Sequence, residues 1–231
     1  MRNLITNIKN IALFAGIQEN DLTNMLSCLN ATAAHYRKGD YILMAGEETN
    51  DVGIVIFGEA TEYKDDILGN RSVISLIHPA NLFAEIFICA GMTVSPVTVE
   101  ASAETDILWL SFNKIMTTCS TCCVFHNTLI KNMLGIIAKK NLALNEKIDH
   151  IAKKTTRQKL ASYLIGQATL KNSNRFTISL DRQKLADYLC VNRSALSREL
   201  SKISSEGILS YNKNRFIIHH VDQLEEILLT E

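Results

Sequence analysis

The sequence of 231 residues lacks most features that mark an enzyme, a membrane protein or a secreted protein. It has no glycine-rich phosphate loop, no His-Glu-x-x-His zinc motif and no nucleophile elbow, so we do not expect an enzyme. No run of about 18 apolar residues is present, so we expect no membrane-spanning helix and no membrane partner. The stretch from Met1 to Asn10 lacks the basic, apolar and small-residue order of a secretory signal.

A disulfide framework is also absent. The chain has six cysteines, three of them packed into Cys119-Ser-Thr-Cys122-Cys123. This pattern in a chain of this length indicates a reducing compartment, and we expect a cytoplasmic protein. The hydrophobic fraction of 47% is ample for a packed core.

The chain has no net charge, but its charges are unevenly placed. Lys and Arg number 24, as do Asp and Glu. Residues 153–231 hold 13 basic and 8 acidic side chains, a net charge of +5, whereas residues 1–152 hold 11 and 16, a net charge of −5. A basic C-terminal third indicates that this end of the protein meets a polyanion.

Hydrophobic periodicity divides the chain into a β-rich part and helical parts. Residues 3–30 fit short helices, and from about residue 36 to residue 110 short β-rich runs alternate with Gly, Asn and Asp turn signals. The regular spacing predicts an antiparallel barrel or roll. The strands are expected at residues 41–44, 52–57, 73–77, 97–100 and 107–112.

A long helix is expected over about residues 123–151. Its apolar positions follow a heptad pattern with steps of four and three residues, which is typical of a coiled-coil dimer. A helix that packs on its own roll is the alternative. The predicted dimer seam consists of Ile130, Leu134, Ile137, Asn141, Leu144, Ile148 and Ile151.

The C-terminal part contains a predicted helix-turn-helix. A helix over residues 181–189 is followed by the break Cys190-Val191-Asn192 and by a second helix over about residues 193–206, which ends at Gly207. The second helix has a polar outer face that bears an arginine, as a DNA-reading helix requires. The candidate DNA-binding residues of this helix are Arg193, Ser194, Ser197, Arg198 and Ser201.

The residue types on this face suit DNA. The planar fork of Arg198 matches the O6 and N7 atoms of guanine, and the small serines allow a close approach. A hairpin with a basic tip follows, and we interpret it as a wing that adds Lys213 and Arg215 to the interface. The expected partner is therefore double-stranded DNA.

Nearly the whole chain resembles the Crp–Fnr family of transcription regulators. The stretch from Arg182 to Arg198 looks like the family's helix-turn-helix, and Ser197-Arg198 matches the Ser-Arg pair of the fumarate–nitrate branch. Cys190 stands where a turn glycine is customary, and Glu199 stands where an apolar residue is usual. The resemblance implies an α+β protein: an N-terminal antiparallel β-roll like those that bind cyclic nucleotides, a long dimerisation helix and a C-terminal winged helix-turn-helix.

The β-roll also carries signatures of that family. Phe83-Ala84-Glu85 looks like the start of the phosphate cassette, with Ala84 in place of a glycine, and Ser95-Pro96 takes the place of the Arg-Ser pair. Loss of that arginine removes a charge-assisted bond to phosphate, so cyclic AMP is not expected as a cofactor. The predicted effector pocket is lined by Glu85, Ser95, Asn141, Leu144 and Asn145, and its ligand is unknown.

A cysteine cluster supports a second reading of the function. Cys119, Cys122, Cys123 and His126 have the spacing of one helix face and could hold a metal ion or form a redox pair. A metal- or redox-sensing protein is therefore the alternative to a regulator controlled by another effector. Packing of small side chains against the roll is the structural explanation of the same pattern.

The predicted organisation has two domains. Residues 1–152 form an effector-sensing roll with the dimerisation helix, and residues 153–231 form the DNA-binding domain. A homodimer presents two reading helices, so the expected target is an inverted repeat with half-sites about one helical turn apart. RNA polymerase is a further candidate partner, and a hinge is expected near residues 153–156.

Overall fold

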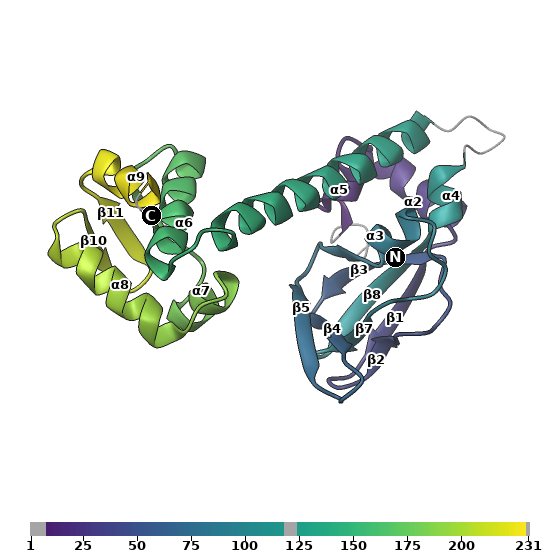
Figure 1. Ribbon diagram of the computed structural model, residues 1–231. Coiled ribbons are helices and arrows are strands. Elements are labelled where there is room, and N and C mark those ends of the chain that lie inside the picture. Colours follow the sequence, from purple (N-terminus) through teal and green to yellow (C-terminus); the bar gives the residue numbers. More distant parts are fainter. Residues whose placement is uncertain (1–7, 118–123, 230–231) are drawn as a thin grey trace. The chain divides into compact units, whose positions relative to one another are not determined.

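The computed structural model describes residues 8–117 and 124–229, except the side chain of Val124. The chain forms two compact units, Met1–Ala138 and Lys139–Glu231 (Figure 1). The boundary lies inside the long helix α5 (Val124–Ile151) and therefore earlier than the predicted domain boundary at residue 152. Within the described ranges, no helix is long and apolar enough to cross a membrane.

The first unit is an antiparallel β-roll built from two four-stranded sheets. One sheet has the order β1-β8-β3-β6 and the other the order β2-β7-β4-β5, and all the pairings are antiparallel. The strands are β1 (Thr32–Tyr36), β2 (Tyr41–Leu43), β3 (Asp51–Phe57), β4 (Ala60–Asp65), β5 (Arg71–Ile77), β6 (Leu82–Phe83), β7 (Thr98–Ala101) and β8 (Thr105–Ser111). Short helical segments accompany them: η1 (Ala12–Phe14), α2 (Glu19–Cys28), α3 (Glu85–Cys89) and α4 (Phe112–Met116).

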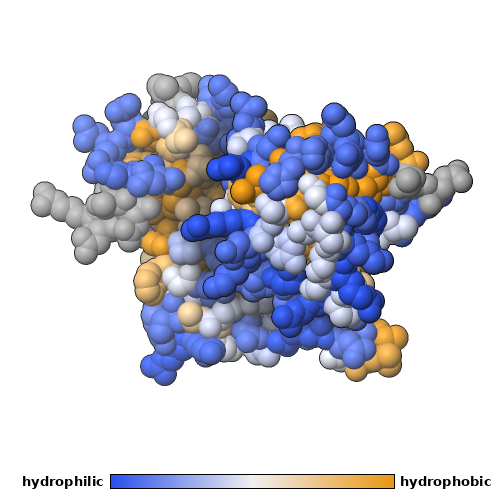
Figure 2. Space-filling view, turned by 90° about the vertical axis from the view of Figure 1, so that its left-hand side faces the viewer, coloured by the Kyte–Doolittle hydropathy of each residue, from blue (hydrophilic) through white to orange (hydrophobic). Residues whose placement is uncertain are grey.

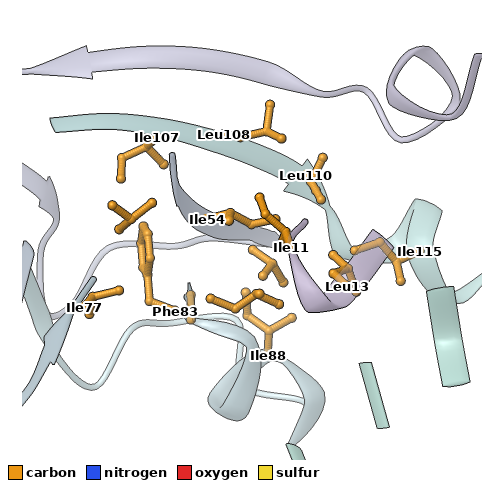
Figure 3. Packing of buried hydrophobic residues seen from close by; sticks show 14 of the residues in the cluster. Ile11, Leu13, Ile54, Ile77, Phe83, Ile88, Ile107, Leu108, Leu110 and Ile115 are labelled. Atoms are coloured by element: carbon orange, nitrogen blue, oxygen red, sulfur yellow. The ribbon is translucent and has the colours of Figure 1, made fainter. Parts of the chain in front are cut away.

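The roll holds one hydrophobic core, to which strands, short helices and α5 all contribute (Figure 3). Ile54 and Ile107 are fully buried on neighbouring strands, and Leu129 and Met133 bring one side of α5 into the same core. The close-up shows isoleucine and leucine side chains from β3, β8 and the short helices around Phe83.

Close packing leaves no room for a side chain at Gly53 on β3. A Cβ atom there would lie 2.0 Å from Cζ of Phe83, so glycine is required at this point of the core.

All five predicted strands are present with small shifts at their ends. Three strands were not predicted: β1, β4 and β6. The sequence of β4, Ala-Thr-Glu-Tyr-Lys-Asp, is mostly polar; the strand buries Ala60 and Tyr63 and pairs with β5 and β7 on its two sides. Pairing between strands is a tertiary contact that local hydrophobicity does not reveal.

The second unit is a winged helix-turn-helix. Its helices are α6 (Thr156–Lys171), α7 (Arg182–Tyr188), α8 (Arg193–Ser205) and α9 (Val221–Leu229), and its strands β9 (Arg175–Thr177), β10 (Leu209–Asn212) and β11 (Arg215–Ile218) form a sheet of order β10-β11-β9. Leu160 and Leu164 of α6 share a fully buried core with Leu196 and Leu200 of α8. This core fixes α8 against α6.

The last turns of α5 pack against the helices of the second unit, which explains where the chain divides. Nδ1 of His150 lies 2.8 Å from the hydroxyl of Ser162 on α6, and its ring meets Tyr163 edge to face. The ammonium group of Lys147 lies over the ring of Tyr188 on α7. Burial lowers the pKa of His150.

Candidate nucleic-acid interface

The helix-turn-helix is defined by side-chain caps at the start of both helices. The Asp181 carboxylate accepts a hydrogen bond from the Lys184 amide at 2.8 Å and caps α7, and the Asn192 amide oxygen accepts one from the Ser194 amide at 2.9 Å and caps α8. Between them Cys190 has a φ of +52°, which turns the chain from one helix to the next. The predicted boundaries of both helices are confirmed to within about a residue.

The outer face of α8 is open. Arg193, Ser194, Arg198 and Ser201 are exposed and Ser197 is half-buried, while Leu196, Leu200 and Ile203 are buried. Neither arginine makes a hydrogen bond, an ion pair or a ring contact with any residue of 8–117 or 124–229. Both guanidinium groups thus keep their full set of donors for an outside partner.

Two serines of this face, Ser194 and Ser201, use their hydroxyl groups within the protein. The Ser194 hydroxyl lies 2.6 Å from the Asn192 side-chain oxygen, and the Ser201 hydroxyl donates to the Ser197 carbonyl at 3.0 Å. They therefore stabilise the local helix geometry. Among the predicted reading residues of α8, the side chains of Arg193, Ser197 and Arg198 make no hydrogen bond to any described residue.

The predicted wing is confirmed as the β10–β11 hairpin. Asn212 pairs with Arg215 across a two-residue loop in which Lys213 has a φ of +53°, and Lys213 and Arg215 are exposed. Arg182, which was not predicted, holds the wing in place. Its guanidinium donates to the Lys213 carbonyl at 3.3 Å and lies 5.3 Å from the centre of the Tyr211 ring.

An ion-pair cluster joins the back of α8 to α6. The Arg157 guanidinium donates to both carboxylate oxygens of Glu206, and it lies 3.9 Å from Glu199, which also pairs with Lys202 at 3.3 Å. The hydrogen bond from Arg157 lowers the pKa of Glu206. Glu199, a departure from the apolar residue usual at its position, therefore lies in a charged cluster instead of an apolar contact.

The face of the molecule drawn in Figure 2 is mainly hydrophilic, with hydrophobic patches. On α5, residues of the predicted dimer seam contribute to the exposed apolar surface. The exposed fractions of Leu134, Leu144 and Ile148 are 62%, 55% and 48%. Asn141 of the seam is exposed, and the remaining seam residues are half-buried: Ile130, Ile137 and Ile151.

The residues of the predicted effector pocket belong to both units. Glu85 and Ser95 are buried in the roll, and the Ser95 hydroxyl donates to the Val97 carbonyl at 2.7 Å. Asn141, Leu144 and Asn145 are exposed on the part of α5 that belongs to the second unit. A pocket that joins all five residues stays a prediction.

The cysteine cluster is described only at one member. Cys119, Cys122 and Cys123 lie outside the described residues, and His126 is buried near the start of α5. Nε2 of His126 lies 4.0 Å from Sγ of Cys28, a residue that the sequence pattern did not single out. Within the described ranges, no three His, Cys, Asp or Glu side chains form a metal-binding group.

Both units match models of known protein domain families. The family model of the Crp-like helix-turn-helix domain matches residues 158–227, and that of the cyclic nucleotide-binding domain matches residues 33–122. The transcriptional activator protein FnrL of Cereibacter sphaeroides is 24% identical over 198 residues, which cover 79% of this chain and 74% of that protein.

Solved structures share the fold. The catabolite activator protein of Thermus thermophilus is 19% identical, with 94% of this chain and 98% of that chain covered and a TM-score of 0.52. A cysteine-to-serine variant of CprK, solved in complex with OCPA, is 16% identical, with 90% and 93% covered and a TM-score of 0.67. The chain belongs to the Crp–Fnr family of regulators, which bind DNA through a helix-turn-helix and are not enzymes.

Proposed function

We propose that the protein is a homodimeric, sequence-specific transcription regulator that reads an inverted repeat in double-stranded DNA. The exposed face of α8, with two arginines that have no partner among the described residues, is the observation that supports base reading. Arg198 is assigned to a guanine edge in the major groove. Arg193, Lys213 and Arg215 are assigned to phosphates beside it.

Two arginine variants distinguish general binding to DNA from recognition of its sequence. Duplexes selected by the wild type from a random pool supply the target, and affinities are measured at two salt concentrations. Arg198→Ala should lose about 1–3 kcal/mol, or about 5- to 150-fold, on the selected sequence and little on unrelated DNA. Arg215→Ala should weaken binding to every sequence and reduce the salt dependence.

The matched control is Arg37→Ala, which removes an exposed arginine from the roll. It should leave both the affinity and the salt dependence unchanged. Equal affinity of Arg198→Ala and wild type for all sequences would remove the reading role assigned to Arg198.

The apolar stripe on α5 supports the homodimer. Leu134, Leu144 and Ile148 repeat at heptad-like spacing and are about half exposed in a single chain, so a second copy of α5 would bury them. Leu144→Glu should shift the protein from dimer to monomer in sedimentation equilibrium. Leu170→Glu places the same charge at an exposed leucine of α6 and should leave the dimer intact. A dimer that survives Leu144→Glu would exclude this seam.

The signal is proposed to reach the DNA-binding unit from the roll. Cyclic AMP is not expected to be that signal, because Ser95 and Pro96 stand where the family's phosphate-binding Arg-Ser pair lies. Added cyclic AMP should therefore leave the DNA affinity unchanged. A rise in affinity at cyclic AMP concentrations near those of the cell would show that another group replaces the arginine. RNA polymerase is proposed as the partner through which the bound dimer alters transcription.

A further inference from the structure

The aromatic side chains of the wing form a row that starts in the core of the second unit and ends at its surface. Phe176 on β9, Phe216 on β11 and Tyr211 on β10 are register partners across the three strands. Their rings stack in pairs, with centroids 5.8 Å apart for Phe176 and Phe216 and 6.2 Å apart for Phe216 and Tyr211. Both phenylalanines are buried, whereas Tyr211, on the outer strand β10, is 36% exposed. The row therefore gives an exposed tyrosine a rigid base.

The start of α7 holds the exposed end of this row. The Arg182 guanidinium lies 5.3 Å from the centre of the Tyr211 ring and 5.9 Å from the centre of the Phe216 ring. The same group donates to the Lys213 carbonyl at 3.3 Å, so it contacts both the strands of the hairpin and its tip. Burial lowers the pKa of Arg182, because the guanidinium is packed against protein atoms. The guanidinium and the rings together fix the wing against the first turn of α7.

The hydroxyl of Tyr211 reaches the outer face of α8. It lies 3.4 Å from Oγ of Ser201, and the Ser201 hydroxyl donates its own hydrogen to the Ser197 carbonyl at 3.0 Å. A hydroxyl has one hydrogen, so Tyr211 is the donor in this long contact. Its oxygen then offers only lone pairs to an outside partner, and a phosphate, which is itself an acceptor, would not bind them. The arrangement favours a positioning role for Tyr211 over a direct contact with phosphate.

We propose that Tyr211 is a positioning residue of the DNA interface, which fixes the wing relative to α7 and α8 so that Lys213 and Arg215 meet the phosphates beside the bases that α8 reads. The inference rests on the proposed phosphate contacts of the wing. Both cationic residues follow Tyr211 on the same hairpin, so a shift of the hairpin moves both of them. Loss of the Tyr211 ring leaves these charges in place but removes the contacts that orient them.

The first test measures the affinity of Tyr211→Ala for the selected duplex and for unrelated DNA at several salt concentrations. Binding to both should weaken, and the slope of log affinity against log salt should become shallower by about 1–2, as expected for the loss of the wing's phosphate contacts. The ratio of the two affinities should stay unchanged, because Arg198 remains in place. Tyr211→Phe keeps the ring and should retain the wild-type affinity and slope. The matched control Tyr41→Ala removes an exposed tyrosine from the roll and should change neither.

A double-mutant cycle separates positioning from direct contact. If Tyr211 acts through the wing, Arg215→Ala should cost far less affinity in the Tyr211→Ala background than in the wild type. Additive losses, or a loss in Tyr211→Phe as large as in Tyr211→Ala, would show that Tyr211 contacts DNA itself and would overturn the positioning role. An affinity that Arg215→Ala lowers and Tyr211→Ala leaves unchanged would overturn it as well.

Hydrogen exchange supplies a readout without DNA. The amides of residues 212–215 should exchange faster in Tyr211→Ala than in the wild type or Tyr211→Phe, while circular dichroism shows that the second unit remains folded. Equal exchange rates in the three proteins would contradict the proposal. DNA binding that does not depend on Arg215 would instead contradict the proposed phosphate contacts of the wing, so the two failures are distinguishable.

Discussion

The turn between α7 and α8 contains a backbone strain that glycine should relieve. Cys190 is exposed and has a φ of +52°, in the left-handed region. An L-residue pays about 1–2 kcal/mol in this conformation, and glycine avoids it. Glycine also gives the unfolded chain more conformational freedom, which cancels about 0.4–1 kcal/mol of the stabilisation gained by relieving the strain. Cys190→Gly should therefore stabilise the second unit by roughly 0.5–1 kcal/mol.

Two spectroscopic probes can assign this effect to the correct unit. For a unit of about 90 residues, the expected gain corresponds to a rise in Tm of about 2–8 °C. Trp109 is the only tryptophan of the sequence and lies on β8, so its fluorescence reports the unfolding of the roll. Far-UV circular dichroism reports both units. The rise should appear in the circular dichroism curve and leave the Trp109 transition unchanged.

Two further glycine substitutions serve as controls. Asn172 at the end of α6 has a φ of +46°, and asparagine tolerates this conformation, so Asn172→Gly should change Tm little. Ala84 is buried in the roll and has a φ of +68°, so Ala84→Gly should raise the Tm of the Trp109 transition and leave the unfolding of the second unit unchanged. A Tm that falls in Cys190→Gly, or that rises as much in Asn172→Gly, would refute the strain argument.

Two predictions concern ion pairs. Hydrogen bonds to Asp106 and Glu104 raise the pKa of exposed His35 above 6.5, so protonated His35 stabilises the roll fully below about pH 6, and this stabilisation is lost as the pH rises through the folded-state pKa. The urea midpoint of the Trp109 transition should therefore fall with rising pH more in the wild type than in His35→Gln. Equal slopes for the two proteins would contradict the prediction. A double-mutant cycle of Arg157→Met and Glu206→Gln should give a coupling of about 0.5–1 kcal/mol for this partly exposed pair, and additive effects would show that the contact contributes nothing.

The DNA-binding unit was predictable from sequence because its boundaries are set by local chemistry. Asp181 and Asn192 cap the helix starts, and Gly207, with a φ of +78°, follows the end of α8. Such signals act within a few residues, so a sequence pattern contains them fully. The face of α8 follows from helical periodicity alone.

Residues that act through distant contacts could not be predicted in the same way. Glu199 is unusual for its position, but its partner Arg157 is 42 residues away, and only the packing of α6 on α8 brings the two together. The same holds for Cys28, which the fold places beside His126. Strand β4 was missed because only two of its side chains, Ala60 and Tyr63, are apolar and buried, and its pairing with β5 and β7 is a contact between distant segments.

The apolar residues of α5 connect the proposed dimer to DNA reading. Leu129 and Met133 bury one side of this helix in the roll, whereas Leu134, Leu144 and Ile148 remain about half exposed on another. In the proposed dimer these three side chains would leave water, at a gain of roughly 1 kcal/mol each per chain. One α8 alone would contact only a half-site of the proposed inverted repeat, so its base contacts would distinguish few sequences. Two copies joined through α5 make the second contact intramolecular, which raises affinity without any new contact and restricts the target to paired half-sites.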